Sequence, residues 1–169
     1  MGSITNLIVK LQKSKFARRF QYEPYIIKSV EYVNPTKGEK LLVVYRETDY
    51  FRSLALESMS KEDYFSWNVE DTFDIDNVEV DKIVFFISTY YLNRQDLNKA
   101  LDRLKENGEV FCICYLRGSK FFETTLKITD KKAFNGLGDE IELFRDFEIL
   151  DIKEFQKEHI KAVKLRRNS

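Results

Sequence analysis

Polar side chains that could bind a ligand follow three apolar runs of this chain. Glu47 comes just after the run at 41–45, and Ser88 and Thr89 directly follow the run at 82–87. The complete candidate set is Glu47, Glu70, Asp71, Ser88, Thr89, Tyr90 and Tyr91. Near-continuous apolar runs are typical of parallel strands covered on both faces, and open sheets of this kind bind ligands beyond the carboxyl ends of their strands. These positions are therefore the predicted ligand-binding edge, although the tyrosines also fit aromatic packing over a strand end.

A second pattern, Asp151-Ile152-Lys153, imitates the acidic-x-Lys arrangement that positions a magnesium ion and a water molecule in nucleases. Magnesium needs several converging oxygen ligands, and the acidic residues nearby in sequence are Asp139, Glu140 and Asp146. Short patterns of this kind arise readily in a chain that is 33% charged. Of three hypotheses about function, a magnesium-dependent nuclease is therefore ranked last.

Cysteine and histidine argue against a metal site. Cys112 and Cys114 are two positions apart in a predicted strand, so both point to the same face and act as small core groups rather than as a disulfide. His159 is the single histidine. Because zinc sites need a Cys/His cluster, no metal is expected, and free thiols favour a reducing compartment.

Length and composition predict one soluble domain. The 169 residues are 43% hydrophobic, enough for one core, with a helical lead-in at 1–38 and a sheet core at 39–169. No apolar run approaches the roughly 20 residues that span a bilayer. We therefore expect a cytoplasmic protein without membrane association.

Charge is balanced overall but unevenly distributed. Basic residues concentrate at Lys10–Arg19 and Lys161–Arg167, whereas residues 62–81 contain no Lys or Arg. Basic segments of this kind predict nucleic-acid binding, but a formal net charge of zero argues against it. Charge runs are more often solvated surface.

The hydrophobic periodicity predicts an open, mostly parallel α/β sheet with helices on both faces and an antiparallel strand pair at its end. Strands are expected at 40–45, 64–69, 82–87 and 109–115. Helices are expected at 4–19, 24–33, 50–60 and 93–106, the last one stopped by Gly108. The chain then continues with an extended segment at 124–128, a helix at 139–145, and a hairpin of 147–151 with 160–165.

This order of elements resembles the class I S-adenosylmethionine-dependent methyltransferases, which have a Rossmann-like fold. Val80–Leu92 resembles the fourth strand of that family and the loop after it. Leu101–Gly108 resembles the Leu-Lys-x-Gly-Gly turn before the fifth strand, with Asn107 in place of the first glycine. Glu142–Glu154 and Lys161–Arg167 resemble the terminal strand pair.

The resemblance implies S-adenosylmethionine as cofactor. Glu47, together with Glu70 or Asp71, would meet its amino group and ribose hydroxyls. The methyl-transfer side would be lined by Ser88, Thr89, Tyr90 and Tyr91. No residue is identified as a general base, and methyl transfer driven by positioning does not require one.

The chain departs from the family in two respects. The segment Tyr45–Tyr50 contains no glycine where the family has two or three, and only glycine lets backbone N–H groups approach the cofactor closely. Residues 46–81 number 36, which is enough for one helix and one strand but not for two full repeats. One strand fewer than in the full fold is therefore expected.

Two main hypotheses follow. In the first, the chain is a degenerate methyltransferase-like protein that retains cofactor binding. In the second, it is a catalytically inactive interaction module, either a homodimer or the partner of another subunit. The second hypothesis is favoured by 14 Phe and 9 Tyr residues, because aromatic residues are enriched at interfaces.

Overall fold

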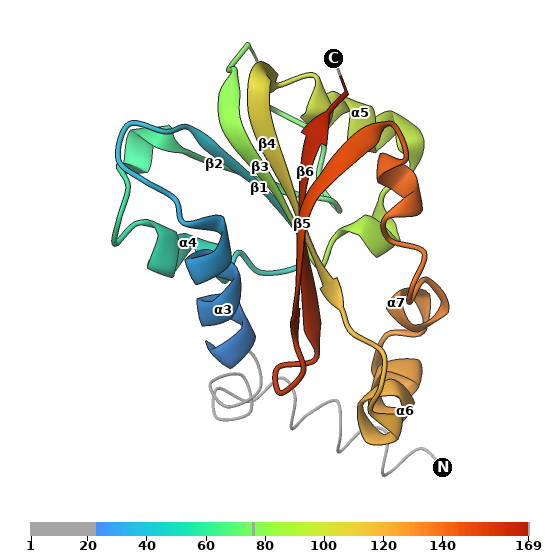
Figure 1. Ribbon diagram of the computed structural model, residues 1–169. Coiled ribbons are helices and arrows are strands. Elements are labelled where there is room, and N and C mark those ends of the chain that lie inside the picture. Colours follow the sequence, from blue (N-terminus) through green and yellow to red (C-terminus); the bar gives the residue numbers. More distant parts are fainter. Residues whose placement is uncertain (1–22, 76, 169) are drawn as a thin grey trace.

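The computed structural model describes residues 23–75 and 77–168, which form a sheet between two layers of helices (Figure 1). Six strands occur in this part of the chain, in the order β2-β1-β3-β4-β6-β5. Their bounds are β1 Leu41–Tyr45, β2 Tyr64–Asn68, β3 Val80–Phe86, β4 Leu104–Tyr115, β5 Phe147–Phe155 and β6 Ile160–Arg167. The predicted helix at 4–19 lies outside the described residues.

Strand pairing confirms the predicted α/β class. Strand β1 pairs in parallel with β2 and β3, and β3 pairs in parallel with β4. Strand β6 is antiparallel to both β4 and β5, which gives the expected terminal hairpin. A single strand, β2, lies between β1 and β3 in the chain, as predicted from the short segment at 46–81.

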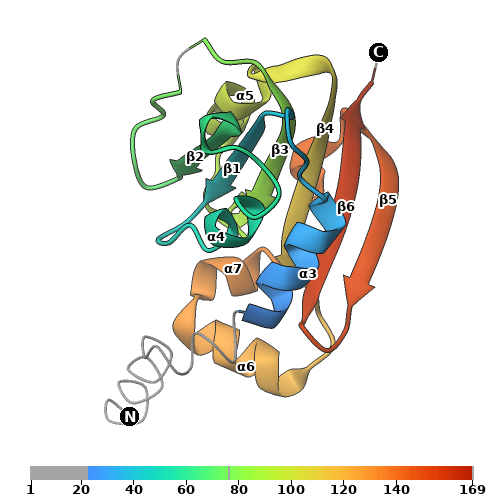
Figure 2. The ribbon, with the colours of Figure 1, turned by 90° about the vertical axis from the view of Figure 1, so that its left-hand side faces the viewer.

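One face of the sheet is covered by α3 (Glu23–Val33) and α4 (Phe51–Ala55) (Figure 2). Tyr25, Ile26 and Phe51 pack there against Val84 and Phe86 of β3. The helix predicted at 24–33 is thus confirmed, whereas that at 50–60 is regular only to Ala55.

The opposite face is covered by α5 (Arg94–Leu101), α7 (Lys131–Asn135) and the 3-10 turn η3 (Glu142–Phe144). Leu97, Ala100 and Leu101 of α5 are buried there, as their spacing predicts. Both cysteines are free and lie in this core. No helix in the described parts of the chain is long and apolar enough to cross a membrane.

Gly108 does not stop a helix, and the prediction of a helix to Glu106 was wrong. Helix α5 ends at Leu101, and Gly108 lies inside the long strand β4. A Cβ atom at Gly108 would lie 2.5 Å from Cδ1 of Leu104 and 3.0 Å from the carbonyl oxygen of Asp81. Close packing between β4 and β3 therefore explains this glycine.

The segment after Gly118 also differs from the prediction. Residues 124–128 are not extended but lie within α6 (Lys120–Thr129). The hydroxyls of Thr124, Thr125 and Thr129 donate to carbonyl oxygens four residues earlier, so these β-branched residues are accommodated within a helix. The predicted helix at 139–145 is reduced to the turn η3.

Lys82 of β3 links the C-terminus of α3 to the sheet. The residue is 8% exposed, and its Nζ donates to the carbonyl oxygens of Val33 (3.4 Å) and Asn34 (3.1 Å) and to Oε2 of Glu39 (2.8 Å). Carbonyls at a helix C-terminus have no partner within the helix, so a buried ammonium satisfies them. Lys82 thereby determines where the chain enters β1.

Asp49 fixes the loop that follows β1. Its carboxylate accepts hydrogen bonds from the Tyr64 hydroxyl, at 2.8 Å to Oδ1, and from the backbone N–H of Arg52 at 3.2 Å. These bonds tie the loop to β2 and to the first turn of α4. Burial raises the pKa of Asp49, although the hydrogen bonds from Tyr64 and Arg52 act in the opposite direction.

Replacing Lys82 by methionine should lower the free energy of unfolding by about 1–3 kcal/mol, because Glu39 and two carbonyls lose a buried partner. Urea unfolding measures this change. Lys99→Met, which breaks an exposed pair with Asp96, is the control and should cost at most about 0.5 kcal/mol. Equal effects of the two substitutions would contradict the role of Lys82.

Replacing Asp49 by asparagine should change the pH dependence of stability. A carboxyl group whose folded-state pKa is raised stabilises the fold below its unfolded-state pKa, and this contribution is lost as pH rises through the folded-state pKa. Asp49→Asn should therefore gain stability relative to wild type between pH 3 and pH 7. Urea unfolding across this range, with exposed Asp74→Asn as control, tests it. A relative loss on raising the pH would show that the hydrogen bonds to Asp49 outweigh its burial.

Candidate functional site

The candidate residues lie where the parallel strands end. Arg46 follows β1, Glu70 lies two residues beyond β2, and Ser88 lies two residues beyond β3. This edge is at the lower end of the sheet in Figure 1, where α6 and α7 also lie. The placement of Glu70 and Ser88 agrees with the sequence prediction, whereas Arg46 was not among the predicted site residues. The role of these residues in binding stays a prediction.

Arg46 is the centre of a cluster of charged groups at this edge. Its Nε donates to Oε1 of Glu70 at 2.9 Å, and its Nη1 lies 3.4 Å from Oδ2 of Asp130. Its Nη2 lies 3.6 Å from Oε1 of Glu47. The guanidinium carbon is 4.2 Å from the centre of the Tyr91 ring. These five residues are called the Arg46 cluster below.

Asp130 links the Arg46 cluster to α7. Its Oδ2 accepts a hydrogen bond from the Tyr91 hydroxyl, and its Oδ1 accepts one from the backbone N–H of Ala133 at 3.1 Å, which caps the helix. Sequence reasoning missed Asp130, because it lies 84 residues from Arg46 and follows a segment predicted to be extended. The signal available was an aspartate just before a short helical run.

The charge of Arg46 is stabilised within this cluster. Partial burial alone would lower the pKa of its guanidinium. The hydrogen bond to Glu70 and the charges of Glu47 and Asp130 outweigh that effect and raise the pKa. Arg46 is therefore a permanent cation held by acids from three separate segments.

Of the two alternatives after β2, the structure brings Glu70 and not Asp71 into the cluster. The Asp71 side chain is exposed, and its backbone carbonyl accepts a hydrogen bond from Nε1 of Trp67 at 3.2 Å. Glu70 accepts from Arg46 while remaining 51% exposed. A carboxylate suitable for a ligand hydroxyl therefore lies at this strand end.

The two hydroxyl residues after β3 differ in their environment. Ser88 is fully buried, and its Oγ donates to the carbonyl oxygen of Val44 at 2.8 Å, which ties the end of β3 to β1. Thr89 is 3% exposed, and its Oγ1 has no hydrogen-bond partner among the described residues. Buried hydroxyls are nearly always paired, and Thr89 shares its lack of a hydrogen-bond partner among the described residues with buried atoms of Arg103 and Glu140.

Tyr90 is a packing residue. Its hydroxyl donates to Oε1 of Glu140 at 3.1 Å and accepts from the backbone N–H of Tyr115 at 2.9 Å. Its ring stacks on that of Tyr115, with centres 5.9 Å apart. Burial raises its pKa, and the neighbouring Cys114 and Glu140 add to the effect. Tyr90 therefore fits the packing interpretation, whereas Tyr91 belongs to the Arg46 cluster.

The glycine-free loop after β1 takes a conformation that glycine favours. Glu47 has a φ of 65°, in the left-handed region, and the backbone N–H of Thr48 donates to the carbonyl of Arg46 at 2.8 Å. A carboxylate side chain therefore stands on this turn. That side chain is 67% exposed, so it extends toward solvent beside Arg46.

The nuclease pattern lies in edge strand β5, and its groups have other contacts. Asp151 accepts a hydrogen bond from the Tyr32 hydroxyl at 2.8 Å. The ammonium of Lys153 lies 5.4 Å from the centre of the Phe155 ring. Among the described residues, no group of three or more His, Cys, Asp or Glu side chains could hold a metal ion.

The basic segment Lys161–Arg167 is largely paired within the fold. Lys164 lies 2.6 Å from Glu109, and Arg167 donates to the carbonyl oxygen of Leu101 at 3.0 Å. The other basic segment, Lys10–Arg19, lies outside the described residues. Nucleic-acid binding through these segments stays a prediction.

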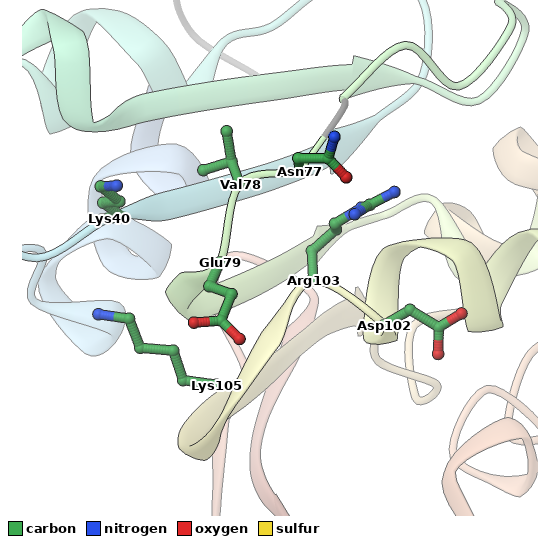
Figure 3. A pocket seen from close by; sticks show the side chains of 7 residues that line it. All are labelled: Lys40, Asn77, Val78, Glu79, Asp102, Arg103 and Lys105. Atoms are coloured by element: carbon green, nitrogen blue, oxygen red, sulfur yellow. The ribbon is translucent and has the colours of Figure 1, made fainter.

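Two hollows lie at the opposite edge of the sheet, near the amino ends of the strands. One has a volume of about 570 Å³ and is lined by Lys40, Asn77, Val78, Glu79, Asp102, Arg103 and Lys105 (Figure 3). Its lining mixes acids and bases, and Lys105 is already paired with Asp81 at 2.6 Å. The other contains Glu39, Lys82 and Glu109 among its lining residues. Neither hollow contains a residue of the Arg46 cluster, and ligands of open α/β sheets bind at the other edge.

No family model matches the sequence, and no curated protein matches it. Solved structures do resemble the fold. A methyltransferase of Thermotoga maritima, described as a possible histamine N-methyltransferase, gives a TM-score of 0.57 at 12% identity, with 99% of this chain and 100% of that chain covered. The glycopeptide N-methyltransferase MtfA, solved with S-adenosyl-L-homocysteine, gives 0.55 at 11% identity over 85% and 87% of the chains.

A larger methyltransferase shares the fold as well. The mitomycin 7-O-methyltransferase MmcR gives a TM-score of 0.54 at 9% identity, with 95% of this chain covered, and this chain spans only 60% of its length. Identities this low show likeness of fold alone. The six strands and their order thus give this chain the fold of the class I S-adenosylmethionine-dependent methyltransferases.

Proposed function

We propose that this chain is a divergent S-adenosylmethionine-dependent methyltransferase-like protein that binds the cofactor at the carboxyl ends of β1, β2 and β3. The observation that carries the proposal is the Arg46 cluster, in which three carboxylates and an aromatic ring from separate segments meet at this edge. The shared fold supports the same location, because open α/β sheets bind ligands there.

The residues at this edge fit the cofactor chemically. S-adenosylmethionine carries an ammonium, a sulfonium and two ribose hydroxyls, which are attracted to carboxylates, and one carboxylate of its own, which is not. Glu70, just after β2, would accept hydrogen bonds from the ribose hydroxyls, and Glu47 would accept from the amino group. The unpaired Oγ1 of Thr89 supplies a further polar contact. The side chain of Asp71 is not needed in this assignment.

The chemistry supplied by the bound cofactor would be a methyl group on a sulfonium. This chain would contribute binding and orientation. The Tyr90 hydroxyl is unsuited to act as a base, because its pKa is raised by burial and it is engaged with Glu140 and Tyr115. Transfer would therefore depend on positioning a nucleophilic acceptor next to the methyl group.

A second candidate function, a catalytically inactive interaction module, is favoured by exposed apolar side chains. Ile149 and Ile152 of edge strand β5 are 47% and 49% exposed, and Phe121 of α6 is 85% exposed. Exposed apolar groups together with an unpaired strand edge are typical of association surfaces. A homodimer or a complex with another subunit would cover them.

Thermal unfolding with added ligands tests the proposal. S-adenosylmethionine should raise the melting temperature saturably, since a ligand at 100 times its Kd stabilises a protein by about 2.7 kcal/mol. NAD, ATP and magnesium should not. If S-adenosylmethionine raises the melting temperature of neither wild type nor Arg46→Gln, the proposal is contradicted, and the interaction module becomes the supported function.

Glu70→Gln should weaken S-adenosylmethionine binding about tenfold in calorimetric titration, because a charge-assisted hydrogen bond is worth about 1.5–3 kcal/mol. Glu57→Gln, on the exposed segment after α4, is the control and should bind as wild type. Weaker binding by Asp71→Asn, with Glu70→Gln unchanged, would transfer the ribose assignment to Asp71.

A further inference from the structure

Arg46 is the one cation of the Arg46 cluster, and it is surrounded by the groups that a cationic ligand would use. Resting on the proposed function, we infer that Arg46 is an internal competitor for the cofactor. In the ligand-free protein, its guanidinium occupies the position that the cofactor's positive charge would take. The site therefore selects S-adenosylmethionine, which has a sulfonium, over S-adenosylhomocysteine, which has a neutral thioether.

Three carboxylates converge on the guanidinium of Arg46. Glu47, Glu70 and Asp130 come from three segments and lie 3.6, 2.9 and 3.4 Å from nitrogens of one guanidinium. Three negative charges thus face a single positive charge within the cluster. Both S-adenosylmethionine and S-adenosylhomocysteine carry an ammonium, which Glu47 would bind, so they differ in charge only at sulfur. A ligand that displaces Arg46 with a neutral sulfur would leave Asp130, whose side chain is only 21% exposed, with less compensating positive charge.

The ring of Tyr91 also attracts cations to this position. The guanidinium carbon lies 4.2 Å from the centre of the Tyr91 ring, and Lys132 brings an ammonium to within 5.5 Å of the same ring. Ring faces attract cations, and aromatic recognition of onium groups is a known use of this attraction. Tyr91 is oriented by its hydrogen bond to Asp130, so the ring is positioned whether or not Arg46 is present.

The side chain of Arg46 is free to move out of the Arg46 cluster. Its side chain is 32% exposed, and two of its acidic partners, Glu47 and Glu70, are 67% and 51% exposed. Exposed ion pairs contribute little to stability, so the long side chain can move into solvent without unfolding the loop. The loop itself stays fixed by Asp49, which contacts Tyr64 and not Arg46.

Thr89 provides an independent sign of a ligand at this edge. It is 3% exposed, lies two residues before Tyr91 in the same 3-10 turn, and its Oγ1 is unpaired among the described residues. Arg46 does not satisfy this hydroxyl.

Arg46→Gln is the decisive substitution. It removes the competing charge, so the affinity for S-adenosylmethionine should rise about tenfold over wild type in calorimetric titration. Arg52→Gln is the matched control, because Arg52 is also partly exposed and lies over a tyrosine ring, that of Tyr64, outside the cluster. Its binding should equal that of wild type. Circular dichroism verifies that both variants are folded.

Charge selectivity is tested with a second ligand pair and a second residue. Wild type should bind S-adenosylmethionine at least tenfold more tightly than S-adenosylhomocysteine, and sinefungin, whose amine replaces the sulfonium, should behave as S-adenosylmethionine does. Tyr91→Leu should reduce this preference at least threefold, whereas Tyr91→Phe, which keeps the ring, should retain most of it.

The outcomes separate the two claims. If wild type binds S-adenosylmethionine and Arg46→Gln binds it no better, Arg46 is not a competitor, and the inference is overturned while the proposed function stands. Equal affinity of wild type for the sulfonium and thioether ligands would also overturn it. If neither wild type nor Arg46→Gln binds any of the three ligands, the proposed function fails, and the inference fails with it.

Discussion

Burial of β1 on both faces is the constraint on which the rest of the structure depends. Leu42 and Val44 point into one core, Leu41 and Val43 into the other, and all four are fully buried. A strand without solvent on either face must have hydrogen-bonded neighbours on both edges, which β2 and β3 provide in parallel. Parallel pairing in turn requires crossovers, and these place α4 and α5 on opposite faces.

The same pairing gathers the charged groups. Because β1, β2 and β3 run in one direction, their carboxyl ends share an edge, and Arg46, Glu70 and Ser88 all follow strand ends there although they are far apart in the chain. Hydrogen bonds hold the backbone at this edge, notably from Ser88 to Val44 and from Tyr64 to Asp49. The side chains of Arg46, Glu47 and Glu70 remain 32%, 67% and 51% exposed beside this frame.

The glycine-free loop after β1 places charged side chains at this edge. Glu47 keeps a left-handed turn, and Asp49 fastens the next residues. Under the proposed function, recognition here would depend on carboxylates and an aromatic ring rather than on backbone N–H groups.

Sequence alone predicted the strands at 40–45, 64–69 and 82–87, which the structure places at 41–45, 64–68 and 80–86, together with the terminal hairpin and the α/β class, because continuous apolar runs and turn residues are local signals. It also placed Glu47, Glu70 and Tyr91 at strand ends. It did not determine the extent of α5 or the contacts of Asp130, which depend on distant segments, and it missed the helical state of 124–128, where Ser119 caps α6 and threonine hydroxyls bond four residues back. Gly108 shows the same limit: a Cβ atom there would meet the nearby Leu104 and also the carbonyl oxygen of Asp81 on β3, and only tertiary structure decides the contact with Asp81.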